Sequence, residues 1–366
     1  MKSTHSEEIY IKKNNLTNTL FDEKSLFFDI ETTGFSPSSS SIYMIGCARR
    51  KGNHICIDQF FAETVNEEKL IISAFIDLLK QYSTIISYNG VGFDIPFLKA
   101  KCDKYNINES FKDYNYIDIF KSVSKIKFLL KLENYKQKSI EKFLGLKRDD
   151  KFSGGELINV YYDYLKAPSD EYLKILYLHN FEDIIGMTEL LPILSYIEIL
   201  NGQYSIEETK ISKYIEYNGN EHKEFLISLK NDYVLPQKVS AKSDLFYIVM
   251  NPEKTLVRIP ILDGELKFFH NNYKEYYYLP AEDNAIHKSV ASFVDSGYKE
   301  KCHAYNCYTR KNSLFLPQLE SLMNPEFKKD YKDKITYFEL TEDFSSSDIM
   351  LRRYVDHIIN YFLKNK

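Results

Sequence analysis

The chain has 366 residues, with 48 lysines and arginines against 52 aspartates and glutamates, so its formal net charge is −4. A protein that binds nucleic acid through bulk charge is basic, which excludes that mode for the whole chain and leaves local patches or bound metal ions. Hydrophobic residues make up 44% and charged residues 27%, as in globular proteins, and the length favours two domains.

The first half of the chain alternates between predicted strands and helices. Residues 1–24 are polar and predict a loose lead-in, whereas 25–28 is an apolar run that predicts a buried strand. Further strands are predicted at 42–47, 55–61, 84–88 and 114–120, and helical spacing is found at 66–81. A helix is expected to begin near Asp94, because the residue before Pro96 avoids helical dihedral angles. From residue 120 to residue 201 the pattern is mostly helical, and Ser169 caps the last long helix.

From residue 203 the composition shifts. Residues 203–235 are charged and predict helix in part, whereas 237–318 alternate and predict an antiparallel sheet. Asp263-Gly264 predicts a two-residue hairpin turn. A final amphipathic helix is predicted at 349–363. We therefore expect a lead-in at 1–24, an α/β domain at 25–202 and a smaller α+β domain at 203–366.

The cysteines and the N-terminal residues bear on the cellular compartment. The five cysteines are scattered and none forms a C-x-x-C pair, so we expect free thiols in a reducing compartment, the cytoplasm. Residues 1–8 are polar and lack the apolar segment of a signal peptide. No apolar run is long enough to span a bilayer, so we expect no membrane partner.

Two acidic residues lie at the end of the first predicted strand. Asp29 and Glu31 are two residues apart, so their side chains lie on the same face of a strand. Side by side they repel each other and lose hydration, and a divalent cation such as magnesium or manganese relieves both costs. A single D-x-E pair is common, however, and by itself it more often marks a strand that ends in a polar turn.

Two more acids follow in suitable contexts. Asp94 sits at the start of a predicted helix, where capping is the commoner role of an aspartate. Asp183 lies on a helix among apolar residues, where a buried carboxylate needs a partner. His179 is one helical turn earlier on the same face, although a single histidine there is more often part of the core. Glu182 is an alternative acid, but its position predicts that it faces outward.

Together these residues resemble the motifs of the DEDD exonuclease superfamily. This resemblance implies a ribonuclease H-like fold, a mixed sheet flanked by helices, which gathers four carboxylates around two metal ions. The matching residues are Asp29 and Glu31 in the first motif, Asn89 and Asp94 in the second, and His179 and Asp183 in the third. Within the superfamily the chain is most similar to the YprB-like group, which shares the His-Asn-x-x-Asp motif and a segment like Ser139–Arg148. The resemblance spans residues 25–200.

This resemblance implies a 3′–5′ exonuclease that hydrolyses phosphodiester bonds of DNA or RNA, with two divalent cations, Mg²⁺ or Mn²⁺, and a single-stranded 3′ end as partner. It implies that Asp29 bridges the two ions, that Glu31 and Asp183 complete one site, and that Asp94 supports the other. The expected substrate contacts are Thr32, Asn89 and Phe93. Rings of Phe35, Tyr88 and Phe97 can also stack on bases, although such rings more commonly pack in cores.

One departure from the family pattern concerns the general base. The two main subtypes carry a histidine five residues, or a tyrosine four residues, before the last aspartate, and Leu178 and His179 hold those places here. Because an imidazole titrates near neutral pH, we expect His179 to orient or deprotonate the attacking water. Tyr177 is a competitor for this role. Asp118 is a further acid near the site, for which a helix cap is the commoner role.

Two functions of other classes fit the same sequence. The first is a nucleic-acid-binding module that keeps the fold without hydrolysis, although the presence of all four carboxylates favours an enzyme. The second is recruitment of a protein partner through residues 203–366. Residues 237–318 are rich in aromatic side chains with lysines nearby, which suits either a surface that binds single strands or a buried contact between domains.

Overall fold

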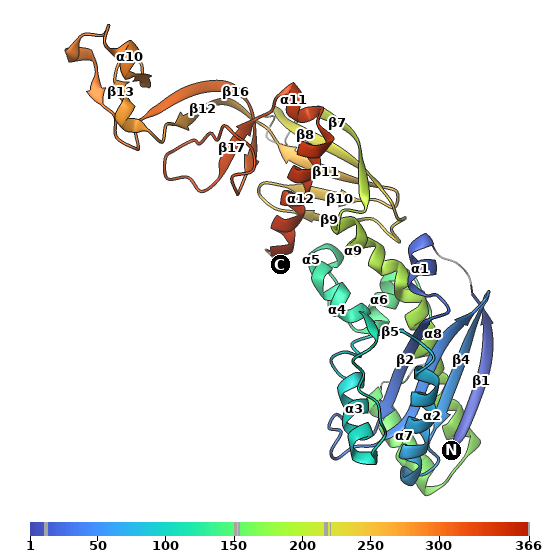
Figure 1. The fold of residues 1–366 in the computed structure, drawn as a ribbon. Helices are drawn as coiled ribbons and strands as arrows, with labels where there is room; N and C mark the ends of the chain where they lie inside the picture. The colour runs from blue at the N-terminus through green and yellow to red at the C-terminus, as the bar shows by residue number, and fades with distance from the viewer. Residues whose placement is uncertain (11–13, 150–151, 153, 216–218, 220, 365–366) are drawn as a thin grey trace. The chain divides into compact units, whose positions relative to one another are not determined.

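The computed structural model describes residues 1–10, 14–149, 152, 154–215, 219 and 221–364, and the chain forms two compact units (Figure 1). Unit 1 comprises Met1–Gln203 and Tyr233–Gln237, and unit 2 comprises Tyr204–Asp232 and Lys238–Lys366. The chain therefore leaves unit 1, returns to it for one short segment, and enters unit 2 again.

Unit 1 is built around a six-stranded mixed sheet with the order β1-β4-β3-β2-β5-β6. The strands are β1 (Lys2–Ile9), β2 (Ser25–Thr32), β3 (Ile42–Lys51), β4 (His54–Phe61), β5 (Thr84–Ser87) and β6 (Asn115–Asp118). Strands β1, β4, β3 and β2 pair antiparallel, whereas β2, β5 and β6 run parallel. The carboxyl ends of β2 and β5 consequently meet at one edge of the sheet.

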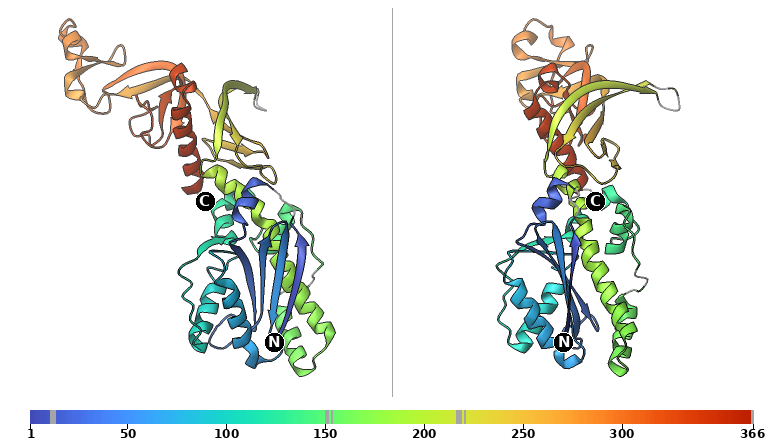
Figure 2. Two further views of the ribbon diagram at one scale, coloured as in Figure 1. Left: turned by 45° about the vertical axis from the view of Figure 1, so that its right-hand side comes forward. Right: turned by 90° about the vertical axis from the view of Figure 1, so that its right-hand side faces the viewer.

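Helices cover both faces of this sheet. They are α1 (Asn15–Leu20), α2 (Glu68–Leu79), α3 (Asp94–Tyr105), α4 (Ile119–Val123), α5 (Lys127–Leu130), α6 (Gln137–Leu144), α7 (Gly154–Lys166), α8 (Asp170–Leu190) and α9 (Ser195–Leu200). Helices α2 and α3 lie against one face, and α7 and α8 lie against the other (Figure 2). The predicted mixed sheet with flanking helices is confirmed.

The alternation of side chains along β2 decides which residues meet which helix. Leu26, Phe28 and Ile30 belong to the apolar core that also contains Phe75 of α2. The residues between them face the side of the sheet that α8 covers. Gly46 of β3 permits this close approach, because a Cβ atom there would lie 2.1 Å from Oδ1 of Asn180 on α8.

The prediction of a loose lead-in at 1–24 is wrong, because its described residues form a strand and a helix. Residues 11–13 lie outside the described part of the chain. Residues 2–9 form β1, which pairs with β4 from Lys2↔Phe61 to Ile9↔His54. Residues 15–20 form α1, capped by the side chain of Asn14. Strand β1 is an edge strand held by its backbone hydrogen bonds while its side chains stay largely exposed, so its polar composition conceals it.

Unit 2 consists of antiparallel sheets and a C-terminal helix, as predicted for the later domain. The five-stranded sheet has the order β7-β8-β11-β10-β9, and the two three-stranded sheets have the orders β12-β16-β17 and β14-β13-β15. The strands are β7 (Tyr204–Ile215), β8 (Glu221–Asn231), β9 (Val239–Lys242), β10 (Tyr247–Met250), β11 (Lys254–Pro260), β12 (Leu262–Phe269), β13 (Tyr276–Leu279), β14 (Asn284–His287), β15 (Glu300–Lys301), β16 (Tyr308–Gln318) and β17 (Thr336–Glu339). Helix α10 spans Lys288–Ala291, α11 spans Glu342–Ser345, and α12 (Asp348–Lys364) confirms the predicted final helix.

Two predictions for unit 2 are wrong. The charged stretch 203–235 forms no helix among its described residues; instead β7 pairs with β8. The predicted hairpin turn Asp263-Gly264 lies inside β12, where it pairs with Leu314 and Ser313 of β16. Only Ile261 separates β11 from β12, and the two strands join different sheets. Pairing with a distant strand therefore overrides the local turn signal.

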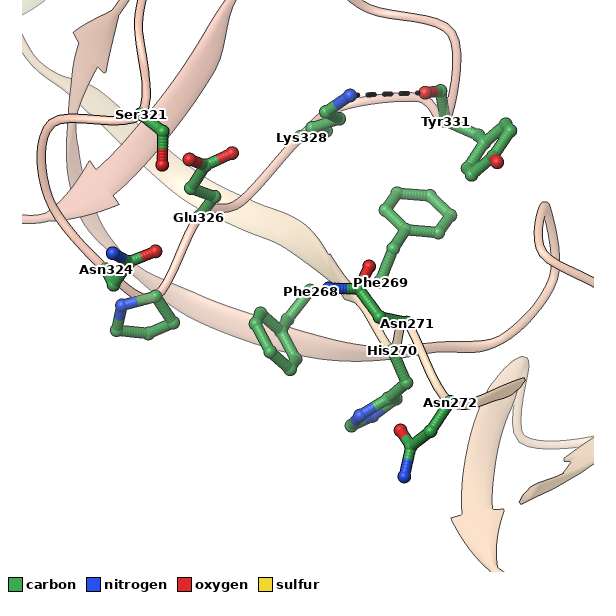
Figure 3. A pocket seen from close by; sticks show the side chains of 11 residues that line it. Phe268, Phe269, His270, Asn271, Asn272, Ser321, Asn324, Glu326, Lys328 and Tyr331 are labelled. Atoms are coloured by element: carbon green, nitrogen blue, oxygen red, sulfur yellow. Dashed lines mark hydrogen bonds between the residues drawn. The ribbon is translucent and has the colours of Figure 1, made fainter. Parts of the chain in front are cut away.

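Unit 2 also contains a pocket of about 1000 Å³ (Figure 3). Phe268, Phe269 and His270 line it from the end of β12, and Lys328 and Tyr331 line it from a later loop. The rings of Phe269 and Tyr331 lie 5.4 Å apart between centroids. Aromatic and cationic side chains thus occur together here, but a role of unit 2 in binding a substrate or a protein stays a prediction.

Two further observations concern compartment and membrane. All five cysteines are free and buried, as predicted for the thiols. Among the described residues, none of the helices has both the length and the apolar character needed to cross a membrane.

Candidate active site

Strand β2 supplies the first two acidic side chains of the site. Asp29 and Glu31 alternate with the core residues Phe28 and Ile30, so both carboxylates point to the face covered by α8. Asp29 lies opposite Gly46 in the β2–β3 register. Both side chains are partly covered, so each carboxylate loses much of its hydration.

The loop after β5 brings the third acid to the same edge. Asp94 is the first residue of α3, and its Oδ1 accepts a hydrogen bond from the backbone N–H of Ile30 at 3.2 Å. Phe93, not Asp94, is the N-cap residue, so the capping role weighed for Asp94 is not what its side chain does. This hydrogen bond ties Asp94, the acid of the second motif, to β2, the strand that carries Asp29 and Glu31.

Asp118 shapes the loop that precedes Asp94. Its side chain accepts hydrogen bonds from the backbone N–H groups of Asn89 at 3.1 Å and Val91 at 3.2 Å. It also caps α4 through the N–H of Lys121 at 3.0 Å, so the helix-cap interpretation is confirmed. Asn89 adopts a left-handed conformation with φ 65°, which asparagine tolerates better than most residues.

Helix α8 supplies the fourth acid and the histidine. Nε2 of His179 lies 3.1 Å from Oδ2 of Asp183 and 3.6 Å from Oε1 of Glu31. One ligand atom from each of these three residues falls within 4.8 Å of the others. Glu182 instead accepts a hydrogen bond from the backbone N–H of Asp149 at 2.9 Å.

Tyr177 has a different environment from His179. Its ring packs 5.6 Å from that of Phe61, in an apolar cluster with Tyr164. Its hydroxyl is buried and has no hydrogen-bond partner among the described residues. Of the two proposed bases, the one that lies beside the carboxylates is therefore His179.

Arg148 is a site residue that the sequence interpretation missed. Its Nη1 lies 2.5 Å from Oδ1 of Asp183, and its Nη2 donates to Oε1 of Glu141 at 2.6 Å. Nε2 of Gln137 donates to Oε1 of Glu141 at 2.9 Å and to the backbone oxygen of Asp183 at 2.8 Å. The segment Ser139–Arg148 carries part of the family resemblance, but only the packing of α6 beside α8 reveals its contact with the third motif.

The pKa values divide the four acids into two kinds. Burial, followed by repulsion from Asp94 and Glu31, holds the pKa of Asp29 well above its ordinary value. Burial raises the pKa of Glu31 to about 8 and that of Asp94 to about 7. Burial also opposes ionisation of Asp183, but His179 and Arg148 more than offset it and lower the pKa of Asp183.

This arrangement fits a divalent cation. The pKa values of Asp29, Glu31 and Asp94 are raised, so these carboxylates favour their protonated forms, and positive charge placed among them would be strongly stabilising. Tyr43 and Asn180 are buried beside Glu31, and each has a side-chain interaction with its carboxylate. Carboxylate oxygens are the ligands that magnesium and manganese prefer.

The residues expected to contact substrate differ in their hydrogen bonds and in their exposure. Oγ1 of Thr32 donates to the backbone oxygen of Gly34 at 2.8 Å. The ring of Phe93 lies 6.3 Å from that of Phe35, which is 90% exposed. Phe97 is only 2% exposed and belongs to the core, so its alternative role in stacking on a base is wrong.

Comparisons with known proteins agree with this fold. Residues 26–195 match the model of the RNase H superfamily. The DNA polymerase of Methanocaldococcus jannaschii is 34% identical over 93 residues, which cover 23% of this chain and 6% of the polymerase. The uncharacterized protein YprB of Bacillus subtilis is 23% identical over 167 residues, which cover 45% of this chain and 40% of YprB.

Among solved structures, the family B DNA polymerase of Pyrobaculum calidifontis aligns with 46% of this chain and 25% of its own, at 18% identity and a TM-score of 0.38. The chain spans less than half the length of the Methanocaldococcus jannaschii polymerase and of YprB. The matched segment contains strands β3 to β6, all of β2 except Ser25, and all three acidic motifs, whereas β1 lies outside it. Residues 26–195 therefore match the RNase H superfamily, and the chain is similar to YprB.

Proposed function

We propose that this chain is a metal-dependent nuclease, a 3′–5′ exonuclease that hydrolyses phosphodiester bonds of DNA or RNA with two divalent cations. The observation that carries the proposal is the convergence of four acids from three separate elements. Asp29 and Glu31 come from β2, Asp94 from α3 and Asp183 from α8, and His179 lies within 3.6 Å of two of them.

Each acid has a role in this proposal. Asp29, Glu31, Asp94 and Asp183 would hold Mg²⁺ or Mn²⁺, which supply positive charge for the phosphate and lower the pKa of a bound water. Asp29 is repelled by all three other acids, which is the charge environment expected of a shared ligand. The local positive charge reconciles an acidic chain with an anionic substrate.

His179 is the proposed general base. Its Nε2 faces the carboxylates of Asp183 and Glu31, and the residue is only 4% exposed, so its orientation is restricted by packing. At this position the imidazole nitrogen can take the proton of a water that attacks the phosphorus atom. The DEDD motifs support the 3′–5′ polarity, because that resemblance implies a terminal phosphodiester as substrate.

The test is digestion of single-stranded DNA and RNA by the full chain. Each oligonucleotide carries a label at its 5′ end and is incubated with magnesium, with manganese, or with EDTA. We expect metal-dependent shortening of the labelled strand from its 3′ end. A single internal cut would contradict the exonuclease assignment, and equal digestion in EDTA would contradict the metal dependence.

One contact favours the alternative of a non-catalytic nucleic-acid-binding protein. Arg148 neutralises Asp183 through an ion pair at 2.5 Å, so this carboxylate already has a cationic partner. Calorimetric titration with Mn²⁺ separates the two functions. An enzyme with the proposed centre binds the ion, whereas a module in which Arg148 replaces it binds nucleic acid but no metal.

A further inference from the structure

Segment 121–148 concentrates positive charge in a chain that is acidic overall. It contains eight lysines and one arginine against two glutamates, and all eight lysines are exposed. Within the part of the chain that the structure describes, seven of them form no ion pair, namely Lys121, Lys125, Lys127, Lys131, Lys136, Lys142 and Lys147. Some exposed lysines elsewhere form ion pairs, as Lys213 does with Glu221 at 2.8 Å. Clustered cations without an acidic partner are typical of nucleic-acid sites.

A groove of about 560 Å³ opens between this segment and residues 88, 89 and 120, a volume in the range of about 300–1,000 Å³ found for ligand pockets. Its lining includes Tyr88, Asn89, Phe120, Lys127, Tyr135 and Gln137. The groove is connected to the acidic centre at two points. Gln137 donates to the backbone oxygen of Asp183 at 2.8 Å, and Asn89 belongs to the loop that leads to Asp94.

Three aromatic rings and two lysines, Lys127 and Lys136, line this groove. The ring centroids of Tyr88 and Phe120 lie 5.9 Å apart. The hydroxyl of Tyr88 donates to the backbone oxygen of Tyr135 at 2.6 Å, which holds the two tyrosines together. Nζ of Lys127 lies 4.9 Å from the centroid of the Tyr135 ring. Rings beside a cation suit unpaired bases, which stack on the rings while the cation attracts the phosphates.

We propose that this groove and the exposed lysines of segment 121–148 bind single-stranded nucleic acid and lead its 3′ end to the acidic centre. The inference rests on the proposed function for the class of ligand, and it adds the surface that holds the strand. The single strand is favoured over a duplex because bases in a duplex are stacked on one another and cannot reach the rings. The groove has aromatic walls, whereas a duplex-binding surface needs only the cations.

The test measures binding separately from hydrolysis. The full chain with Asp29→Asn is titrated, in EDTA and at several salt concentrations, against fluorescein-labelled oligothymidylate, oligouridylate and a DNA duplex, and anisotropy reports binding. The test variant adds Lys127→Gln, Lys131→Gln and Lys136→Gln. The matched control adds Lys24→Gln, Lys69→Gln and Lys112→Gln, three exposed lysines of unit 1 outside the segment. A third variant, Phe120→Leu, removes one ring, and its melting temperature is compared with that of the parent.

The expected result is weaker salt dependence of binding in the test variant alone. Each phosphate contact on a single strand contributes about 0.7 to the slope of log K against log salt, so the test variant should lose about 2 from that slope. Phe120→Leu should weaken binding about 5- to 150-fold without changing the salt slope, since base stacking on one ring contributes about 1–3 kcal/mol. Equal effects of the test and control triples, or equal affinity for the duplex, would overturn the inference.

This design keeps the inference distinct from the proposed function. If wild-type protein fails to cleave but the test triple loses the salt slope, the groove binds a strand and the nuclease proposal fails. If the wild type cleaves and the test triple binds as the control does, the nuclease proposal stands and the groove is rejected. If the Asp29→Asn chain binds no strand at all, the inference is rejected.

Discussion

His179 and Asp183 stand one helical turn apart on α8, with Nε2 of His179 3.1 Å from Oδ2 of Asp183. The same Nε2 lies 3.6 Å from Oε1 of Glu31 on β2, so one imidazole spans the first and third acidic motifs. The close approach that Gly46 allows between β3 and α8 brings this helix face against the strand. Substitutions at and around these residues are therefore expected to affect metal binding, catalytic rate and stability to different extents.

Asp29→Asn should abolish metal-dependent hydrolysis while the chain stays folded. The pKa of Asp29 is raised by burial and by three neighbouring acids, so the metal-free protein gains nothing from its charge. Removal of that charge should leave the free energy of unfolding unchanged or higher in EDTA. Urea denaturation and the end-labelled digestion assay measure the two effects. Asp77→Asn, an exposed acid on α2, serves as control, and turnover near wild type in Asp29→Asn would reject the assigned centre.

His179→Ala should slow hydrolysis without abolishing metal binding. A general base typically contributes about 10²–10⁴-fold to the rate, and the four acids remain in this variant. Single-turnover digestion gives the rate, and calorimetry with Mn²⁺ gives the affinity. Tyr177→Phe is the matched comparison, because the hydroxyl of Tyr177 lies in an apolar cluster. A larger loss of rate in Tyr177→Phe than in His179→Ala would transfer the role of base to the tyrosine.

Arg148→Met should destabilise the fold. The guanidinium group pairs with both Glu141 and Asp183, and its side chain is only 10% exposed. Removal of one partner of a buried ion pair leaves the other charged and desolvated, at a cost of about 3–5 kcal/mol. Urea denaturation measures this loss.

The double variant Arg148→Met with Glu141→Met identifies the cause of that loss. It removes both charges between α6 and α8, while His179 remains beside Asp183. We expect its stability to return toward that of the wild type, because no unpaired charge is left on Glu141. A double variant no more stable than Arg148→Met would mean that lost packing, and not the unpaired charge, causes the effect.

The metal-free chain should lose stability as pH rises from about 4 to about 8. The pKa of Glu31 is raised from 4.5 to about 8 and that of Asp94 from 3.8 to about 7, so the folded state holds these protons more tightly than the unfolded state. Their stabilisation is complete below the unfolded pKa values and disappears as pH passes the folded ones. Each group contributes up to about 1.4 kcal/mol per pH unit in this window.

Melting temperatures in EDTA and in Mg²⁺ across this pH range measure that loss. We expect the decline in EDTA to be reduced by Mg²⁺, which takes over the neutralising role of the protons. Asp183, whose pKa is lowered, has the opposite sign and adds stability that is lost only at acid pH. Asp94→Asn should flatten the EDTA profile. A profile in EDTA that does not fall with pH would contradict the assigned protonation.

Local sequence patterns were sufficient to predict which side chains share a face of one strand or one helix. Alternation along one strand puts Asp29 and Glu31 on the same face, and the helical repeat puts His179 beside Asp183. The final helix of unit 2 followed from the same periodicities, whereas the mixed sheet with its flanking helices was implied by the family resemblance. These relationships hold within one element, so they do not depend on how the elements pack.

The tertiary structure alone decided the contacts between distant elements. The polar strand β1 joins the sheet through backbone pairing with β4. Asp263 and Gly264, which predict a turn, lie instead in strand β12 and pair with β16. The tertiary structure also brought Arg148 to Asp183 and returned Gln237 to unit 1, where its backbone oxygen accepts a hydrogen bond from Tyr196 at 2.7 Å. In each case the partner lies far away in the chain, and the free energy of that pairing outweighs a local preference of about 1 kcal/mol.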